Sequence, residues 1–224
     1  MRPLAILRPE PSASSTASAA EALGLTPIVM PLFRIEPVAW RAPAPAGFDG
    51  LLLTSANAVR HGGRGLDQLR GLAAYCVGEA TASEARNAGF TVAGVGLSGV
   101  DSLLETLPDG LRLLHLCGAD RRDPADPRQS VEPVRVYRAV ELPVPLNLDQ
   151  LEGAVAAAYS PRTAARLSSL VDQAGLRRER IAVAVMSDTA AKAAGPGWER
   201  VESASDPSES ALLALAVELC DNRR

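Results

Sequence analysis

The sequence predicts an α/β protein made of two domains, each built on a doubly wound parallel sheet. Three observations carry this prediction. Short apolar runs alternate with Ala-rich helical segments, the order of these elements partly repeats, and two Pro-flanked segments have the pattern of linkers. The 224 residues allow one large domain or two small ones.

The apolar runs predict the strands. Most of them are continuous rather than alternating, which is typical of strands buried on both faces. The runs predicted as strands are residues 4–7, 51–53, 75–77, 111–116, 154–159 and 181–186.

The segments between these runs predict helices, because each starts near Ser, Thr, Asp or an equivalent capping residue. The helices expected are residues 12–23, 81–88, 162–174 and 208–219. Strands and helices that alternate in this way indicate parallel sheets.

The order of elements repeats once along the chain. Residues 75–82 lead to Gly89 and Phe90 and then to a helix that ends near residue 107. Residues 184–191 lead to Gly197 and Trp198 and then to the C-terminal helix. Identical residues are sparse, so the repeat indicates a duplicated architecture.

Two connecting segments, residues 33–38 and 134–140, alternate apolar and charged side chains, as half-exposed strands do. Two such connectors can pair with each other. We therefore predict a discontinuous first domain (residues 1–35 and 139–224) and an inserted second domain (residues 38–134). Residues 120–133 are polar and contain three prolines, which predicts an exposed loop.

Composition excludes several classes of protein. With 47% hydrophobic and 22% charged residues the chain has the balance of a soluble globular protein, and its net charge of −3 argues against general nucleic-acid binding. No apolar run reaches 18 residues, and the first run is cut by Arg8, so we expect neither a membrane span nor a secretion signal.

The three cysteines form no metal-binding pattern and predict buried thiols in a reducing cytoplasm. Only two histidines are present, so a His-based metal site is not expected. The pattern predicts that His115 lies in the core and that His61 lies in an exposed loop.

Candidate site residues stand where the predicted strands end. In a doubly wound sheet ligands bind at the carboxyl ends of the strands, and the helix that follows offers unpaired N–H groups and a dipole that favour anions. This predicts a shared cleft for a ligand with several carboxylates. The same residue types cap helices, so a cap and a ligand contact both stay open at each position. The strand ends are Arg8, Thr54, Ser55, Gly78, Gly118, Ser160 and Ser187.

Other chemistries lack their sequence signatures. The sequence has no glycine fingerprint after the first predicted strand, no P-loop and no nucleophile elbow. Its carboxylates are scattered without an acid–base pair. An enzyme with this sequence therefore works mainly by positioning and by oriented dipoles.

Short motifs in a fixed order resemble the uroporphyrinogen-III synthase family. The most telling are Leu-Thr-Ser-Ala-Asn-Ala-Val at 53–59 and Tyr-Cys-Val-Gly-Glu-Ala-Thr-Ala at 75–82. Each is weak alone, but the set covers nearly the whole chain. The other matching segments are residues 7–9, 99–104, 114–122, 136–138, 159–163 and 187–190.

The resemblance implies two α/β lobes joined by a two-stranded β-ladder, with a cleft between them. It also implies that hydroxymethylbilane loses water and cyclises to uroporphyrinogen III through a spiro intermediate, with inversion of ring D, in heme biosynthesis. Such an enzyme uses no cofactor or metal. The resemblance further implies a cytoplasmic monomer that makes transient contact with the preceding pathway enzyme.

The resemblance assigns roles to individual residues. Tyr137 matches the tyrosine of the linker strand and would assist loss of the hydroxyl group, the alternative being an aromatic side chain packed on the ladder. Thr81 matches a catalytic threonine of the inserted lobe. The implied substrate contacts are Arg8, Thr54, Ser55, Asn57, Gly78, Gly118, Arg121, Ser160, Arg162, Ser187 and Thr189.

The sequence also departs from the family. Ser187 replaces a glycine, Ala190 stands where a second threonine often follows, and the segment after Gly118 is too short for one helix. Gly62, Gly63 and Gly65 predict a loose loop. These departures favour a second reading, a non-catalytic two-lobed binding module for a polycarboxylate or tetrapyrrole. A third reading, a nucleotide-dependent enzyme, is disfavoured because the chain lacks the glycine motif of such enzymes.

Overall fold

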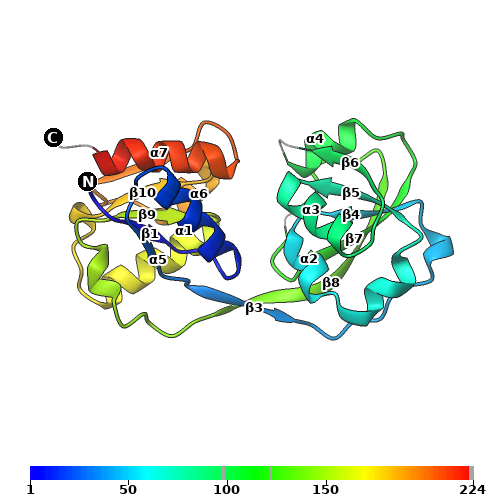
Figure 1. Cartoon of the computed structure of the whole chain (residues 1–224), viewed down its shortest axis with the longest axis horizontal. Coiled ribbons are helices and arrows are strands. Elements are labelled where there is room, and N and C mark those ends of the chain that lie inside the picture. The colour runs from blue at the N-terminus through cyan, green and yellow to red at the C-terminus, as the bar shows by residue number, and fades with distance from the viewer. Residues whose placement is uncertain (97–98, 122, 222–224) are drawn as a thin grey trace. The chain divides into compact units, whose positions relative to one another are not determined.

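The computed structural model describes residues 1–96, 99–121 and 123–221. The chain forms two compact units, each with its own sheet (Figure 1). Unit 1 contains Met1–Arg34 and Val140–Arg224, and unit 2 contains Ile35–Ala139.

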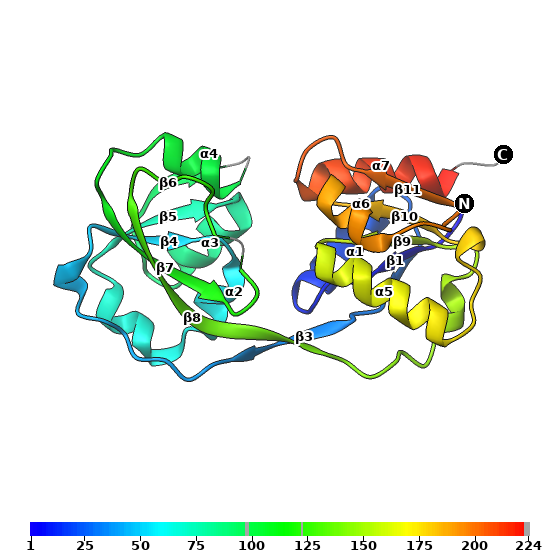
Figure 2. The ribbon, with the colours of Figure 1, turned by 180° about the vertical axis from the view of Figure 1, so that it is seen from behind.

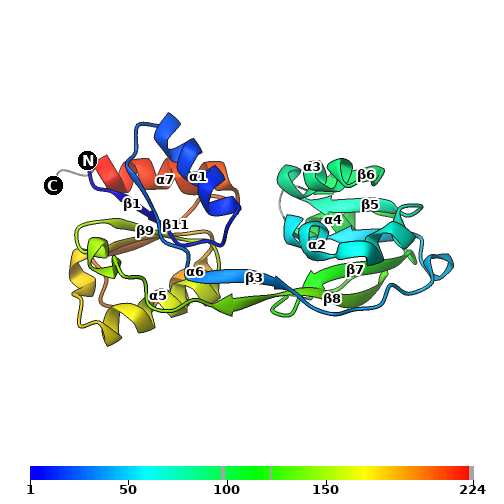
Figure 3. The same cartoon turned by 60° about the horizontal axis from the view of Figure 1, so that its bottom comes forward.

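The sheet of unit 1 has five parallel strands in the order β11-β10-β9-β1-β2. The helices α1 and α7 lie on one face and α5 lies on the other (Figure 3). The strands are β1 (Leu4–Ile6), β2 (Pro27–Val29), β9 (Val155–Ala158), β10 (Ala182–Val185) and β11 (Arg200–Ser203). The helices are α1 (Ser12–Ala22), α5 (Pro161–Gln173), α6 (Asp188–Ala194) and α7 (Glu209–Asp221).

The three central strands of this sheet explain why their sequences are continuous apolar runs. Every residue of β1, β9 and β10 is buried, because both faces of the sheet are covered by helices. Small side chains dominate β9 and β10, and the core on one face is completed by leucines of α7 such as Leu212 and Leu219. The prediction of doubly wound parallel sheets is confirmed for this unit.

The sheet of unit 2 has the strand order β3-β8-β7-β4-β5-β6, in which β4 to β8 pair in parallel. The strands are β3 (Phe33–Pro37), β4 (Gly50–Leu53), β5 (Ala73–Val77), β6 (Val92–Gly96), β7 (Arg112–Gly118) and β8 (Ser130–Glu141). The helices are α2 (Ala56–His61), α3 (Glu79–Asn87) and α4 (Val100–Glu105).

Alternate residues of β4 divide the core of unit 2. Leu51 and Leu53 pack with residues of α2 and α3, whereas Leu52 packs with Leu103 and Leu104 of α4. The side chains of a strand point alternately to the two faces, so one buried strand supplies both cores.

The connecting segments β3 and β8 pair as the alternating pattern predicts (Figure 2). The amide of Val38 donates to the carbonyl of Val136, and the amide of Leu142 donates to the carbonyl of Leu32, each at 3.0 Å. The numbering rises along one strand as it falls along the other, so the pair is antiparallel.

The predicted loop over residues 120–133 is wrong at its end. The strand β8 already begins at Ser130, because Ser130–Pro133 pair with Arg112–His115 of β7. The described residues between β7 and β8 form no helix, in agreement with the short sequence there.

The prediction of a loose glycine loop is also wrong. Helix α2 is followed by a 3-10 helix, η2 (Gly63–Leu69), so His61 ends a helix and is half-buried rather than lying in an exposed loop. A Cβ on Gly62 would lie 2.7 Å from the Leu66 side chain, which explains that glycine, and Trp40 explains Gly65. The Trp40 Nε1 donates to the carbonyl of Gly62 at 2.8 Å, and a Cβ on Gly65 would lie 2.6 Å from the Trp40 ring.

The buried polar and sulfur-bearing residues agree with the sequence. The thiols of Cys76, Cys117 and Cys220 are free and buried, and His115 is only 1% exposed. Within the described ranges, no helix has the length and apolar character that a membrane crossing requires.

Candidate functional site at the carboxyl edges of the two sheets

The carboxyl ends of neighbouring parallel strands meet at one edge of each sheet. In unit 2 this edge carries Thr54 and Ser55 after β4, Gly78 after β5 and Gly118 at the end of β7. In unit 1 it carries Arg8, Ser160 and Ser187, which follow β1, β9 and β10. The structure thus gathers the predicted strand-end residues into two groups, one on each unit.

Tyr137 of β8 joins the group of unit 2. It pairs in register with Gly118, and its ring lies so close that a Cβ on Gly118 would be 2.8 Å from two ring carbons. The Ser55 side chain lies within hydrogen-bonding reach of the Tyr137 hydroxyl and acts to lower the pKa of that phenol. The ring centroid of His61 lies 6.5 Å from that of Tyr137. Gly118 is therefore needed without a side chain so that Tyr137 can reach Ser55.

Burial sets the protonation state of this phenol. Desolvation raises the pKa of Tyr137 above its usual value, and the Ser55 hydrogen bond opposes that rise without cancelling it. Tyr137 is therefore protonated at neutral pH, and its hydroxyl is available as a hydrogen-bond donor.

Thr54, the residue before Ser55 at the end of β4, forms a second polar pair, with His115. The Oγ1 of Thr54 lies 3.0 Å from Nε2 of His115. Burial, and secondarily the charge of Arg121, lowers the pKa of His115 to about 4, so the imidazole is neutral at physiological pH. The Nδ1 atom of His115 has no hydrogen-bond partner among the described residues. Sequence reasoning placed His115 in the core but missed its link to Thr54.

Three predicted serines act as helix caps. The Oγ atoms of Ser55, Ser160 and Ser187 accept hydrogen bonds from the amides of Asn57, Thr163 and Ala190 at 3.2, 3.1 and 3.4 Å. A cap uses the oxygen as an acceptor and leaves the hydroxyl hydrogen free to be donated, as Ser55 shows at Tyr137.

The two threonines assigned to matching turns occupy different helix positions. Thr81 is the third residue of α3 and is 5% exposed, whereas Thr189 is the second residue of α6 and is exposed. Ala190 takes the buried third position in α6. Gly78, with φ +80°, precedes α3 and has no side chain to cap it.

The predicted arginines lie against groups of the protein itself. Arg8 Nη1 lies 3.2 Å from Oε1 of Glu209, and the Nε of Arg121 lies 2.8 Å from Oδ1 of Asp123. The Arg162 guanidinium lies over the ring of Phe33, 4.7 Å from its centroid. Each positive charge is thus oriented by a neighbour before any ligand arrives.

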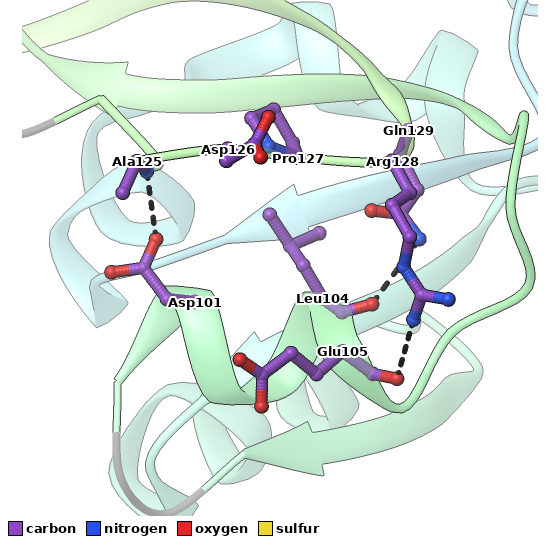
Figure 4. Close-up of a pocket in the computed structure, with 8 residues that line it drawn as sticks. All are labelled: Asp101, Leu104, Glu105, Ala125, Asp126, Pro127, Arg128 and Gln129. Atoms are coloured by element: carbon purple, nitrogen blue, oxygen red, sulfur yellow. Dashed lines mark hydrogen bonds between the residues drawn. The ribbon is translucent and has the colours of Figure 1, made fainter.

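A separate cavity of about 140 Å³ lies in unit 2 between α4 and the segment that precedes β8 (Figure 4). Its lining contains none of the predicted site residues. Gln129 is 5% exposed, and its Nε2 donates to the carbonyls of Leu104, Leu107 and Pro108 at 3.1, 3.2 and 3.0 Å. These hydrogen bonds hold the segment before β8 against the end of α4 and the turn after it. They give Gln129 a structural role.

Within the ranges that the structure describes, no three His, Cys, Asp or Glu side chains gather in a way that could hold a metal ion.

Comparisons with known proteins place the chain in a family. The family model for uroporphyrinogen-III synthase HemD matches residues 14–214. A comparison with curated proteins found no match.

Two solved structures share the fold. The structure of uroporphyrinogen-III synthetase from Helicobacter pylori is 18% identical, with a TM-score of 0.61, over 98% of this chain and 100% of that one. A mutant uroporphyrinogen III synthase from Thermus thermophilus is 21% identical, with a TM-score of 0.53, over 98% of this chain and 99% of that one.

Proposed function

The chain belongs to the uroporphyrinogen-III synthase family, and we propose that it converts hydroxymethylbilane to uroporphyrinogen III with loss of water and inversion of ring D. The family's members are lyases of porphyrin biosynthesis that act on a small-molecule substrate, and this chain is such an enzyme. The particular reaction and the residues that perform it are the proposal.

The contact of Tyr137 with Ser55 carries the proposal. Loss of the hydroxyl group breaks a carbon–oxygen bond, and the oxygen must gain a proton to leave as water. The Tyr137 phenol is protonated, half-buried and oriented by Ser55 and Gly118 at the carboxyl edge of unit 2. We assign it the role of general acid: its proton passes to the departing oxygen as the carbon–oxygen bond breaks, and the proton that the substrate loses on ring closure restores the phenol.

The electron density that expels the hydroxyl group comes from the substrate itself. The pyrrole nitrogen next to the hydroxymethyl carbon can stabilise the cation that remains, so no strong protein acid is required. Ring closure through a spiro intermediate then depends on how the chain of rings is held. Thr81, buried in the first turn of α3, is assigned to the reacting group of residues in unit 2 together with Gly78, Thr54 and Asn57.

Carboxylate recognition is assigned to the remaining residues. Ser160, Ser187 and Thr189 stand at helix N-termini of unit 1, where backbone N–H groups and the helix dipole favour anions. Arg8, Arg121 and Arg162 supply positive charge. A polycarboxylate such as hydroxymethylbilane matches these donors.

A coupled assay tests the reaction. Hydroxymethylbilane is generated in place, and the oxidised porphyrin isomers are separated by chromatography. The uncatalysed closure proceeds without inversion and gives isomer I, so isomer III that depends on this protein supports the synthase. Isomer I alone, from protein shown to be folded, would overturn it.

A second candidate function is a binding module without activity. The cap at Ser187 and the exposed position of Thr189 favour it, because the turn of unit 1 lacks a buried hydroxyl equivalent to Thr81. Tight binding of uroporphyrin together with isomer I alone in the coupled assay would identify this module.

The proposal extends to the state of the enzyme in the cell. We expect a cytoplasmic monomer that touches the preceding pathway enzyme only transiently. Sedimentation checks both: the protein alone should give one species of monomer mass, and the mixture should give two, each at the mass of one protein and with no stable complex.

A further inference from the structure

Four side chains meet at the carboxyl edge of unit 1, and we call them the Arg8 cluster. Arg8 follows β1, Thr16 lies in α1, Tyr159 follows β9, and Glu209 begins α7. The Arg8 guanidinium lies 4.3 Å from the Tyr159 ring centroid, and its Nη1 donates to Thr16 Oγ1 at 3.1 Å. Thr16 in turn donates to the Glu209 carboxylate.

Glu209 is the member of this cluster that can leave it. Its side chain is 44% exposed, whereas that of Arg8 is 24% exposed and Thr16 is fully buried. A carboxylate that is nearly half in water regains hydration at little cost when it swings out. Arg8 cannot follow, because it is stacked on Tyr159, and its charge then requires another anion.

The Tyr159 hydroxyl points to the same conclusion. It is buried, and among the described residues no group makes a well-formed hydrogen bond to it, although Thr16 and Arg8 lie near enough to influence its pKa. Desolvation raises that pKa, so the phenol keeps its proton and is a donor without an acceptor. A ligand oxygen beside Arg8 would supply the acceptor.

We propose that Arg8, Thr16 and Tyr159 form a carboxylate subsite that Glu209 fills in the free protein and that a substrate carboxylate takes over on binding. This inference rests on the proposed function and adds a specificity determinant to it. Because one anion replaces another, the charge of the cluster stays balanced. A neutral ligand cannot displace Glu209, so the subsite rejects tetrapyrroles that lack carboxylates.

Competition from Glu209 makes a prediction that an ordinary structural ion pair does not make. Removing its charge should tighten binding, because the substrate no longer has to displace it. The expected gain is about threefold to fivefold in affinity, the factor that corresponds to a partly exposed ion pair. The same change should lower KM.

The experiment measures uroporphyrin III binding by fluorescence to the wild-type chain and to Glu209→Gln. Glu218→Gln is the matched control, since it removes the same charge from an exposed position of the same helix. The variant Arg8→Gln and the double variant Arg8→Gln/Glu209→Gln complete a double-mutant cycle, which measures the coupling between the two side chains. Melting temperatures show that each variant is folded, and Tyr159→Phe tests the hydroxyl separately.

The proposal is upheld if Glu209→Gln binds more tightly, Glu218→Gln does not, and the gain disappears in the Arg8→Gln background. Unchanged or weaker binding by folded Glu209→Gln overturns it, as does the absence of uroporphyrin binding by both wild type and variant. The isomer assay is independent: isomer I alone rejects the proposed reaction, while the binding cycle still decides on the subsite.

Discussion

The carboxyl edges of the two sheets share one plan and differ in chemistry. Both consist of strand ends followed by helices with small polar residues at their starts. The edge of unit 2 presents hydroxyl groups and a neutral imidazole, in Tyr137, Ser55, Thr54 and His115. The edge of unit 1 presents the ion pair of Arg8 and Glu209. In the proposed function, the same architecture serves proton donation on one sheet and carboxylate anchoring on the other.

The turns before α3 and α6 show the same division at the level of one residue. Ser187 caps α6 with its own oxygen, so one backbone N–H of that helix is already occupied. Gly78 has no side chain, and the corresponding N–H groups of α3 are left to other acceptors. The turn before α3 thus leaves free a backbone N–H that the serine cap occupies in the turn before α6.

The largest expected effect is on the reacting edge of unit 2. Tyr137→Phe should lower kcat by about 10²–10³-fold, because it removes the proposed donor while keeping the ring on Gly118. Tyr75→Phe is the matched control, since Tyr75 belongs to the same unit but packs in the other core, with Leu103. Steady-state rates in the isomer assay measure both. Equal rates for the two variants would remove Tyr137 from the reaction.

Stability against acid should also separate the units, because both histidines lie in unit 2. The pKa of His115 falls from 6.5 to about 4 on folding, so between these values the unfolded chain binds the proton and the folded chain does not. The free energy of unfolding should therefore fall by about 3 kcal/mol as pH drops from 6.5 to 4.

Urea unfolding at several pH values checks this loss. The test variant combines His115→Leu with Thr54→Val, so that the Thr54 hydroxyl is not left without its partner. In this variant most of the pH dependence of stability between pH 4 and 6.5 should disappear. A slope equal to that of the wild type would show that other groups cause it.

Gly118→Ala should reduce activity about tenfold without removing any reacting group. Its new Cβ would lie 2.8 Å from the Tyr137 ring, so the ring must shift away from Ser55. Gly94→Ala is the control, because it crowds Tyr75 at 3.2 Å elsewhere in the same sheet. Activity and melting temperature are measured for both, and a loss of activity in Gly94→Ala of the same size would reduce the effect to packing.

The smallest effect distinguishes a cap from a ligand contact. Ser187→Ala should cost about 1 kcal/mol of stability and change kcat less than twofold, because the hydroxyl caps α6. Ser55→Ala should cost a similar stability but also reduce kcat, since it removes the partner of Tyr137. Chemical denaturation and the isomer assay give both quantities; a large loss of kcat in Ser187→Ala would assign that serine to the substrate.

The fold follows from sequence patterns because those patterns are local. Continuous apolar runs marked the buried strands, alternation marked β3 and β8, and serine marked the starts of α2, α5 and α6. Glycine was misread after Ser55, where close contact with Trp40 rather than loop flexibility requires it at position 65. That contact joins segments that no local pattern connects.

The site could be predicted only as a set of strand ends. Thr54 and His115 are 61 residues apart, and Thr16 and Glu209 are 193 apart, so their contacts arise from the sheet order and from the packing of helices. Tyr159 belongs to a segment that resembles the family, but the sequence assigned it no role, because its buried hydroxyl and its contact with Arg8 are visible only in the structure.

The order of strands in unit 1 has a consequence for synthesis on the ribosome. The strand β1 lies between β2 and β9, and β9 is made only after all of unit 2. At typical elongation rates β1 therefore waits roughly 10–30 s for that neighbour. Unit 2 is continuous in sequence and can complete its sheet during that interval. The apolar face of α1 meanwhile lacks α7, so the nascent first segment is the part of this chain most exposed to chaperones.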